Sequence, residues 1–132
     1  MLRHSKAFSG FSVDDLQKAE EFYGRVLGLT VRINPMGILE MKLSGGNSVI
    51  VYPKPNHEPA TYTVLNFPVP DLEKAVEALT ARGLRFEQYV GALQTDELGI
   101  FRDGDMKIAW FKDPAGNILS ILEEKQESAL PQ

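Results

Sequence analysis

The chain contains no cysteine in its 132 residues. Without thiols it forms no disulfide, no thiolate zinc site and no iron–sulfur cluster, and it has no cysteine nucleophile. It has only two histidines, so a serine-type catalytic triad also has little support. The fold must therefore be stabilised by an apolar core, and a single domain of this length buries enough surface for that.

Basic clusters and long apolar runs are also missing. The formal net charge is −4 at pH 7, which argues against nucleic acid as a partner. No apolar run approaches the roughly 20 residues of a membrane span. The opening segment Met1–Lys6 is not followed by a signal-peptide core. We expect a cytoplasmic protein with one domain over residues 1–132 that binds neither nucleic acid nor membrane.

One pattern occurs twice. Residues 11–21 read FSVDDLQKAEE, and residues 67–77 read FPVPDLEKAVE. In each copy an apolar run leads to an aspartate that can cap a helix, and apolar residues then follow at helical spacing. A Gly-Leu pair ends each helix, at Gly28 and at Gly83. We therefore predict two repeats, about 5–53 and 61–123, followed by a tail at 124–132.

Each repeat is predicted to be a βαβββ unit. Strands are expected at 6–13, 29–34, 38–43 and 48–52, and again at 62–69, 85–89, 106–112 and 118–122. Residues 90–105 are expected to form a long loop, a candidate lid or partner contact. The predicted class is α+β: two βαβββ repeats that form a curved mixed sheet with a concave cup, the helices lying outside. Such a cup suits a small molecule.

Two segments carry a family likeness. They are the helix pattern from Val13 to Leu29 and the run Trp110–Asn117, which contains Asp-Pro-Ala-Gly-Asn. Together with the repeat, they resemble the vicinal oxygen chelate superfamily, which includes glyoxalase I, extradiol dioxygenases, fosfomycin-resistance transferases and bleomycin-resistance proteins. The resemblance covers about residues 6–123 and implies this fold and a homodimer. It does not fix an activity, because one fold hosts many chemistries.

The same resemblance bears on metal binding. Metalloenzymes of this superfamily carry His, Gln or Glu ligands at matched inner-face positions of the two halves. In this chain those positions hold Phe8, Ile50, Val64 and Ser120. One hydroxyl among three hydrocarbon side chains is too few donors for a divalent metal. The resemblance therefore implies a branch that lacks the usual metal, and we expect no cofactor.

Strand alternation extends the inner face to further residues. Val64 is expected to share its face with Tyr62 and Asn66, and Ile50 with Tyr52, while comparison with fosfomycin-type enzymes adds Trp110. We predict a ligand-binding cup lined by Phe8, Tyr52, Tyr62, Asn66, Trp110 and Ser120. Aromatic walls stack on flat or apolar ligands, and a few amides or hydroxyls orient them.

Two other features are given no chemical role. His57 lies in the Pro-rich connector 53–59 and is expected to be a solvated loop residue. Asp113–Asn117 is expected to be a simple turn between two strands.

Three functions remain open from the sequence. The first is a protein that binds a small organic molecule without metal, as the bleomycin-resistance branch does. The second is a metal-dependent lyase, isomerase or dioxygenase with other ligands, such as Glu40, His57 or Glu97. The third is a protein-interaction module whose cup is filled. Whether the chain is an enzyme is left undecided.

Overall fold

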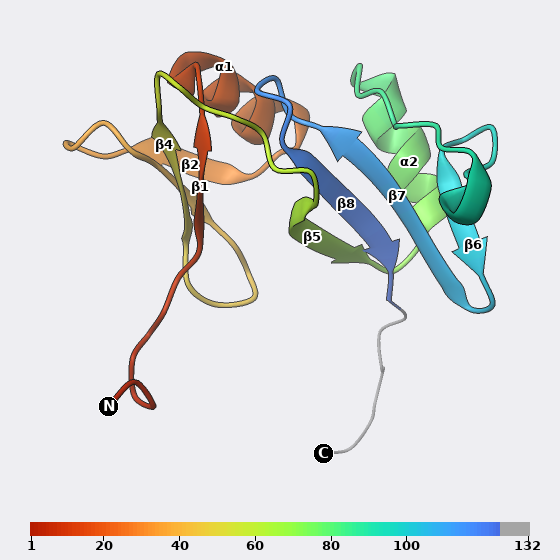
Figure 1. The fold of residues 1–132 in the computed structure, drawn as a ribbon, viewed down its shortest axis with the longest axis horizontal. Coiled ribbons are helices and arrows are strands. Elements are labelled where there is room, and N and C mark those ends of the chain that lie inside the picture. The colour runs from red at the N-terminus through yellow and green to blue at the C-terminus, as the bar shows by residue number, and fades with distance from the viewer. Residues whose placement is uncertain (125–132) are drawn as a thin grey trace. The chain divides into compact units, whose positions relative to one another are not determined.

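The computed structural model describes residues 1–124 and divides into two compact units (Figure 1). Unit 1 comprises Met1–Ala60 and Asp113–Asn117, and unit 2 comprises Thr61–Lys112 and the chain from Ile118 onward. Each unit contains one four-stranded mixed sheet and one α-helix. The predicted α+β class with two βαβββ-like halves is therefore confirmed. Apart from Glu124, the predicted tail lies outside the described residues.

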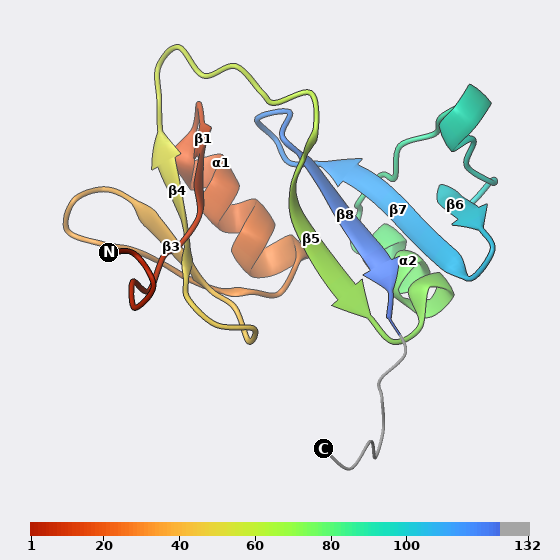
Figure 2. The same cartoon turned by 60° about the horizontal axis from the view of Figure 1, so that its bottom comes forward.

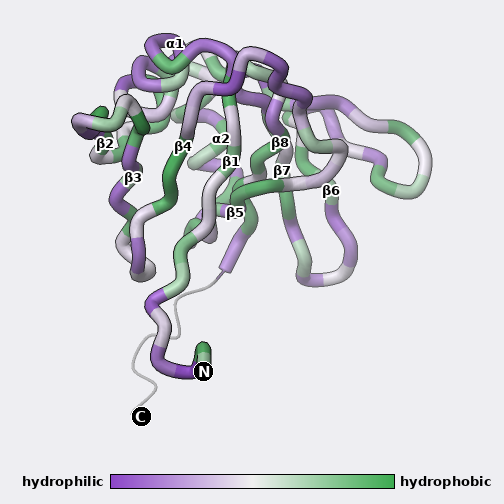
Figure 3. Tube along the Cα trace, turned by 60° about the vertical axis from the view of Figure 1, so that its left-hand side comes forward, coloured by the Kyte–Doolittle hydropathy of each residue, from purple (hydrophilic) through white to green (hydrophobic). Residues whose placement is uncertain are grey.

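The sheet of unit 1 has the strand order β1-β4-β3-β2. Its strands are β1 (Gly10–Val13), β2 (Thr30–Ile33), β3 (Leu39–Lys42) and β4 (Val49–Pro53). β1 runs parallel to β4, and the other neighbours are antiparallel. In β3, Leu39 and Met41 are fully buried while Lys42 is exposed, and this period of two is visible as alternating hydropathy along the trace (Figure 3). One face of the sheet thus packs in the core and the other does not.

The helix of unit 1 begins where the sequence predicts it. Asp15 is the N-cap, and its carboxylate accepts a hydrogen bond from the backbone N–H of Lys18 at 3.1 Å. α1 (Leu16–Glu21) then widens into a π-helical turn, η1 (Phe22–Val26). Gly28 ends the helix with φ 75°, a conformation that glycine adopts without strain.

Unit 2 repeats this plan with the strand order β5-β8-β7-β6. Its strands are β5 (Thr63–Val69), β6 (Ile100–Asp103), β7 (Met106–Lys112) and β8 (Ile118–Glu123). α2 (Leu72–Ala81) is capped by Asp71, which accepts from Lys74 N at 3.1 Å, and it packs against β7 and β8 (Figure 2). No helix in residues 1–124 is long and apolar enough to cross a membrane.

The prediction for residues 85–105 was wrong in part. Residues 85–89 form no strand and contribute only a single bridge, from Phe86 to Phe111. The strand β6 and a short 3₁₀ helix, η2 (Gly91–Leu93), lie inside the segment predicted as a loop. A two-residue turn at Gly104–Asp105 joins β6 to β7, and this Gly-Asp pair was the signal for the hairpin.

A second turn directs the chain into β6. The Asp96 carboxylate accepts hydrogen bonds from the backbone N–H groups of Leu98 and Ile100, both at 2.9 Å. Gly99 has φ 89°, and a Cβ there would lie 2.8 Å from Cβ of Phe86. This turn needs both an Asp at its start and a glycine near its end.

The turn Asp113–Asn117 joins β7 to β8, yet it belongs to unit 1. The buried Asp113 carboxylate accepts from Ala115 N at 3.0 Å, Asn117 N at 2.9 Å, Asn117 Nδ2 at 3.0 Å and the Tyr23 hydroxyl at 2.7 Å. Asn117 Nδ2 also donates to the backbone oxygen of Ser12, at 2.9 Å. The segment is a turn, as predicted, and it is also an integral part of the core of unit 1.

The Tyr23–Asp113 bond makes stability sensitive to alkali. Burial, followed by the nearby Asp113 carboxylate, raises the pKa of Tyr23 above its ordinary value. The phenol of an unfolded chain ionises near about pH 10, so stability present below that pH is lost as the pH rises above it. We expect the free energy of unfolding to fall above about pH 10, and Tyr23→Phe to lack this component of the fall.

At pH 7 the same Tyr23→Phe change should cost about 1–3 kcal/mol, because a buried hydrogen bond to a carboxylate is lost. Urea unfolding at pH 7, 9 and about 10.5 measures both effects. Tyr62→Phe is the matched control, since Tyr62 is 69% exposed and should leave both values unchanged. An equal loss of stability in alkali for wild type and Tyr23→Phe would contradict this assignment.

Candidate functional site

Three of the predicted ligand-binding residues are direct neighbours in the sheet of unit 2. Ser120 on β8 pairs with Asn66 of β5 on one side and with Trp110 of β7 on the other. The residues flanking Trp110, Ala109 and Phe111, are fully buried, whereas Trp110 is half-buried. Because successive side chains point to opposite faces, this row lies on the face that α2 does not cover.

Asn66 and Ser120 are hydrogen-bonded to each other. Ser120 is fully buried, and its Oγ donates to Asn66 Oδ1 at 2.5 Å. Asn66 itself is exposed. Within residues 1–124 its Nδ2 takes part in no hydrogen bond. The pair therefore holds an amide nitrogen in a fixed orientation, with its N–H groups free for solvent or a ligand.

Two aromatic residues that the sequence did not predict lie against Trp110. The ring centroids of Tyr89 and Trp110 are 5.4 Å apart, and those of Phe101 and Trp110 are 6.0 Å apart. Burial, followed by the nearby Glu87 carboxylate, raises the pKa of Tyr89. Tyr89 lies in a segment predicted as a strand and Phe101 in a segment predicted as a loop. Their contacts with Trp110 could therefore not be predicted from the sequence. Together the three rings form an aromatic wall.

The alternation predicted for Tyr62, Val64 and Asn66 is wrong. Thr63 pairs with Ile118, but the register shifts between Thr63 and Leu65, so Val64 lies at a bulge. One extra residue in a strand breaks the period of two. Tyr62 precedes β5 and is 69% exposed.

In unit 1, Phe8 and Ile50 line the same groove, of about 290 Å³. Its lining is Lys6, Phe8, Glu40, Asn47, Ser48 and Ile50. Phe8 is 64% exposed. A Cβ at position 10 would lie 2.6 Å from Cγ1 of Ile50. The Ile50 side chain therefore lies across the backbone of Gly10. Phe8 and Ile50, the two family ligand positions in unit 1, thus line one groove.

The start of β1 differs from the prediction. The strand was expected from Lys6, but it begins at Gly10, because its partner β4 begins only at Val49. The preceding residues are exposed, and Asn47 Nδ2 donates to the backbone oxygen of Ala7 at 2.6 Å. Tyr52, which pairs with Ser12 in register, is 38% exposed.

The face of unit 1 is more charged than the predicted lining. A second groove of about 340 Å³ shares two residues with the first and is lined by Thr30, Val31, Arg32, Glu40, Lys42 and Ser48. Glu40 accepts from Asn34 Nδ2 at 2.9 Å and from Arg32 Nε at 3.0 Å, one bond on each carboxylate oxygen. These bonds, that of Asn34 first, lower the pKa of Glu40. Glu40 is therefore held as a paired carboxylate.

His57 is not the solvated loop residue that we expected. Its Nδ1 lies 2.6 Å from Ser12 Oγ, and its Nε2 lies 3.1 Å from the backbone oxygen of Ala115. Because a carbonyl only accepts, Nε2 carries the proton in the neutral ring, and Ser12 Oγ then donates to Nδ1. The imidazole is part of the structure of unit 1 and joins β1 to the turn Asp113–Asn117.

The residues at the family's ligand positions do not fit a divalent metal. Phe8, Ile50 and Val64 have no donor atom, and the hydroxyl of Ser120 already bonds Asn66. Of the alternative ligands, Glu40 and His57 are engaged as described, and Glu97 is exposed in unit 2. We derive no chemistry through a metal at these positions.

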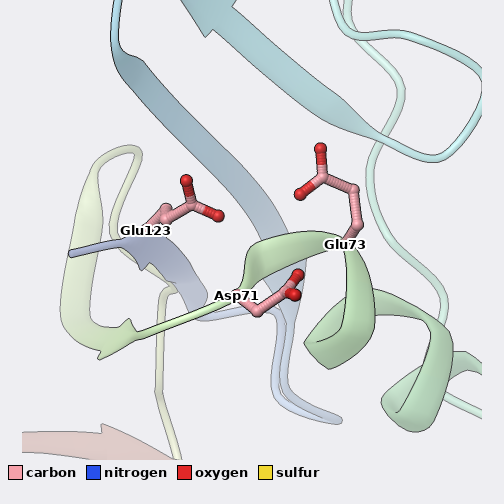
Figure 4. A group of neighbouring side chains, drawn as sticks. All are labelled: Asp71, Glu73 and Glu123. Atoms are coloured by element: carbon pink, nitrogen blue, oxygen red, sulfur yellow. The ribbon is translucent and has the colours of Figure 1, made fainter. Parts of the chain in front are cut away.

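One group of three carboxylates in residues 1–124 has the spacing of metal ligands (Figure 4). Oxygen atoms of Asp71, Glu73 and Glu123 lie within 4.8 Å of one another. However, Lys107 Nζ lies 3.3 Å from Glu73 and 3.4 Å from Glu123, and Glu123 accepts from Leu72 N at 3.0 Å. Glu73 also pairs with Arg102 at 3.0 Å, and Asp71 caps α2, so each of the three carboxylates already has a partner.

A groove of about 640 Å³ lies on the helix side of unit 2, between α2 and residues 83–88 and 97–98. Val76, Leu84 and Phe86 are its buried lining residues, and Glu77, Arg85 and Glu97 on it are exposed. None of the six predicted ligand residues lines it, nor does any buried polar side chain of residues 1–124. Binding sites need a few fixed polar groups, so we favour the Asn66–Ser120–Trp110 row despite the size of this groove.

Comparisons with known proteins agree with the resemblance drawn from the sequence. A family model described as Glyoxalase/Bleomycin resistance protein/Dioxygenase superfamily matches residues 7–121. No curated protein sequence matches the chain. Solved structures with the same fold include TnmS3, an antibiotic binding protein from Streptomyces sp. CB03234, with 19% identity and a TM-score of 0.68 over 95% of this chain and 99% of that one.

Two further structures have the same fold. A member of the glyoxalase/bleomycin resistance protein/dioxygenase superfamily from Sphaerobacter thermophilus is 23% identical, with a TM-score of 0.65 over 94% of this chain and 100% of its own. Lactoylglutathione lyase from Agrobacterium tumefaciens is 20% identical, with a TM-score of 0.65 over 91% of this chain and 93% of its own. At these identities the structures establish a common fold only.

The position of His57 gives a direct test. His57→Ala removes two hydrogen bonds from unit 1 and should lower the free energy of unfolding by about 1–3 kcal/mol. His4→Ala is the matched control, since the only other histidine is exposed and should leave stability unchanged. Urea unfolding followed by circular dichroism measures both variants. If His57→Ala is as stable as His4→Ala, the bonds to Ser12 and Ala115 do not persist in solution.

Proposed function

The chain belongs to the glyoxalase/bleomycin resistance protein/dioxygenase superfamily, and from this premise we propose that it binds a small organic molecule without the family's usual metal. In unit 2 the proposed ligand contacts are Trp110, Asn66 and Ser120 on the helix-free sheet face, with Tyr62 just before β5. In unit 1 the proposed contacts are Phe8 and Tyr52.

The observation that carries this proposal is the row Asn66–Ser120–Trp110. The Ser120 hydroxyl donates to the Asn66 carboxamide oxygen at 2.5 Å, and the amide N–H groups have no hydrogen-bond partner among residues 1–124. Beside it, Trp110 lies against Tyr89 and Phe101. A flat or apolar molecule stacks on such a wall, while a carbonyl, carboxylate or phenol oxygen of the ligand accepts from Asn66 Nδ2.

Binding rather than chemistry is the function that these residues support best. No residue in the row is a general base or an activated nucleophile, and the family's ligand positions carry no set of metal donors. The fold is shared with an antibiotic binding protein as well as with a lyase, so it is compatible with either activity. The residues of this chain favour binding and release of a ligand without chemical change.

Trp110 is the only tryptophan and therefore reports on its own site. We expect its fluorescence to change on titration with one or more members of a panel of aromatic and carbonyl metabolites. For a ligand found in this way, Trp110→Ala and Asn66→Ala should each weaken binding at least about tenfold, measured by calorimetry because Trp110→Ala removes the fluorophore.

Leu98→Ala is the matched control for these variants. Leu98 is 44% exposed and lines the groove on the helix side of unit 2, away from the row. It should bind the ligand as the wild type does. Unchanged affinity for Trp110→Ala, or a loss confined to Leu98→Ala, would remove the ligand from the proposed site.

Metal content tests the competing enzyme function. We expect protein purified without chelators or metal-affinity resin to contain well under one equivalent of divalent metal by elemental analysis. The reason is that Phe8, Ile50 and Val64 supply no donor and Ser120 supplies one hydroxyl. One equivalent of metal whose removal and return abolish and restore ligand binding would contradict the metal-free proposal.

A further inference from the structure

We infer that the helix-free face of unit 1 selects for an organic anion, which deepens the proposed function by naming the chemical class of ligand. Two adjoining grooves of about 290 and 340 Å³ cover this face and share Glu40 and Ser48. Their charged lining residues are Lys6, Arg32, Lys42 and Glu40. Three cations therefore face one carboxylate.

The single carboxylate does not neutralise the lysines. Glu40 bonds Arg32 and Asn34, with both of its oxygens occupied. Neither Lys6 nor Lys42 forms an ion pair or side-chain hydrogen bond with any residue of 1–124. Both ammonium groups are therefore available to a ligand, and each adds one uncompensated positive charge to the face.

This charge is unusual for the chain that carries it. The formal net charge of the protein is −4, yet the four charged residues of the two grooves sum to +2, from three cations and one anion. A concave surface lined by charge of one sign attracts ions of the opposite sign and raises their local concentration. The protein as a whole repels anions, whereas this groove attracts them.

The same face supplies contacts for an apolar body. Phe8 and Ile50 line the first groove together with Lys6, and Ser48 and Asn47 add a hydroxyl and an amide. The Ile50 side chain packs against the backbone of Gly10, which limits its movement toward the sheet. The ligand that suits this lining has an apolar or aromatic body and a carboxylate or phosphate group that reaches the lysines.

Three probes that share a naphthalene body test the inference: 2-naphthoate, its neutral isostere 2-naphthamide, and 2-naphthyl phosphate, measured by equilibrium dialysis at two salt concentrations. We expect at least one of the two anions to bind at least about tenfold more tightly than the amide, with an advantage that shrinks at high salt. Lys6→Gln/Lys42→Gln should remove most of that advantage and leave the amide unchanged. The relative affinity of the two anions distinguishes a carboxylate ligand from a phosphate ester.

Lys18→Gln/Lys74→Gln is the matched control, because it changes the net charge equally through exposed lysines on α1 and α2. If both double variants lose the anion advantage equally, the advantage comes from net charge alone, and the inference is overturned. Equal binding of all three probes, lost in Trp110→Ala, would overturn it while leaving the proposed function intact. No binding by any probe at millimolar concentration would count against the proposed function and, with it, this inference.

Discussion

The buried carboxylate of Asp113 is the constraint on which the organisation of unit 1 depends. A buried charge is tolerated only when donors surround it, and Asp113 has them from its own turn, from Asn117 and from the Tyr23 hydroxyl. Two further bonds extend this arrangement to β1, one from Asn117 to the Ser12 oxygen and one from Ser12 to His57, whose other ring nitrogen bonds Ala115. The family's Asp-Pro-x-Gly-Asn pattern therefore has a structural explanation in this chain, and it does not need a catalytic one.

The duplication is visible in the details as well as in the plan. Asp15 and Asp71 cap the two helices with the same bond length of 3.1 Å. The Gly-Asn pairs of the two repeats differ in partner, since Asn47 donates to the Ala7 oxygen of its own repeat and Asn117 donates to the Ser12 oxygen of the first repeat. The repeats differ where function would differ: one helix-free face carries lysines and a paired glutamate, and the other carries an aromatic wall beside Asn66.

Much of the fold could be predicted because its signals are local. Helix caps, glycine stops and the period of two each depend on a few adjacent residues, and they located both helices and seven of the eight strands. The errors arose where distant partners decide. Arg85–Tyr89 is predicted as a strand, but Ile100–Asp103 takes the place beside β7. The bulge at Val64 depends on β8, and the role of His57 depends on Ser12 and Ala115, which are 45 and 58 positions away. The same limit hid Tyr89 and Phe101 from the predicted site.

The assignment of Asp113–Asn117 to unit 1 has a consequence for dividing the chain. Unit 1 includes five residues that lie within the second repeat of the sequence, so a fragment ending at Ala60 would contain Tyr23 without its acceptor Asp113. The boundary between the two repeats in the sequence is therefore not the boundary between the two units of the structure.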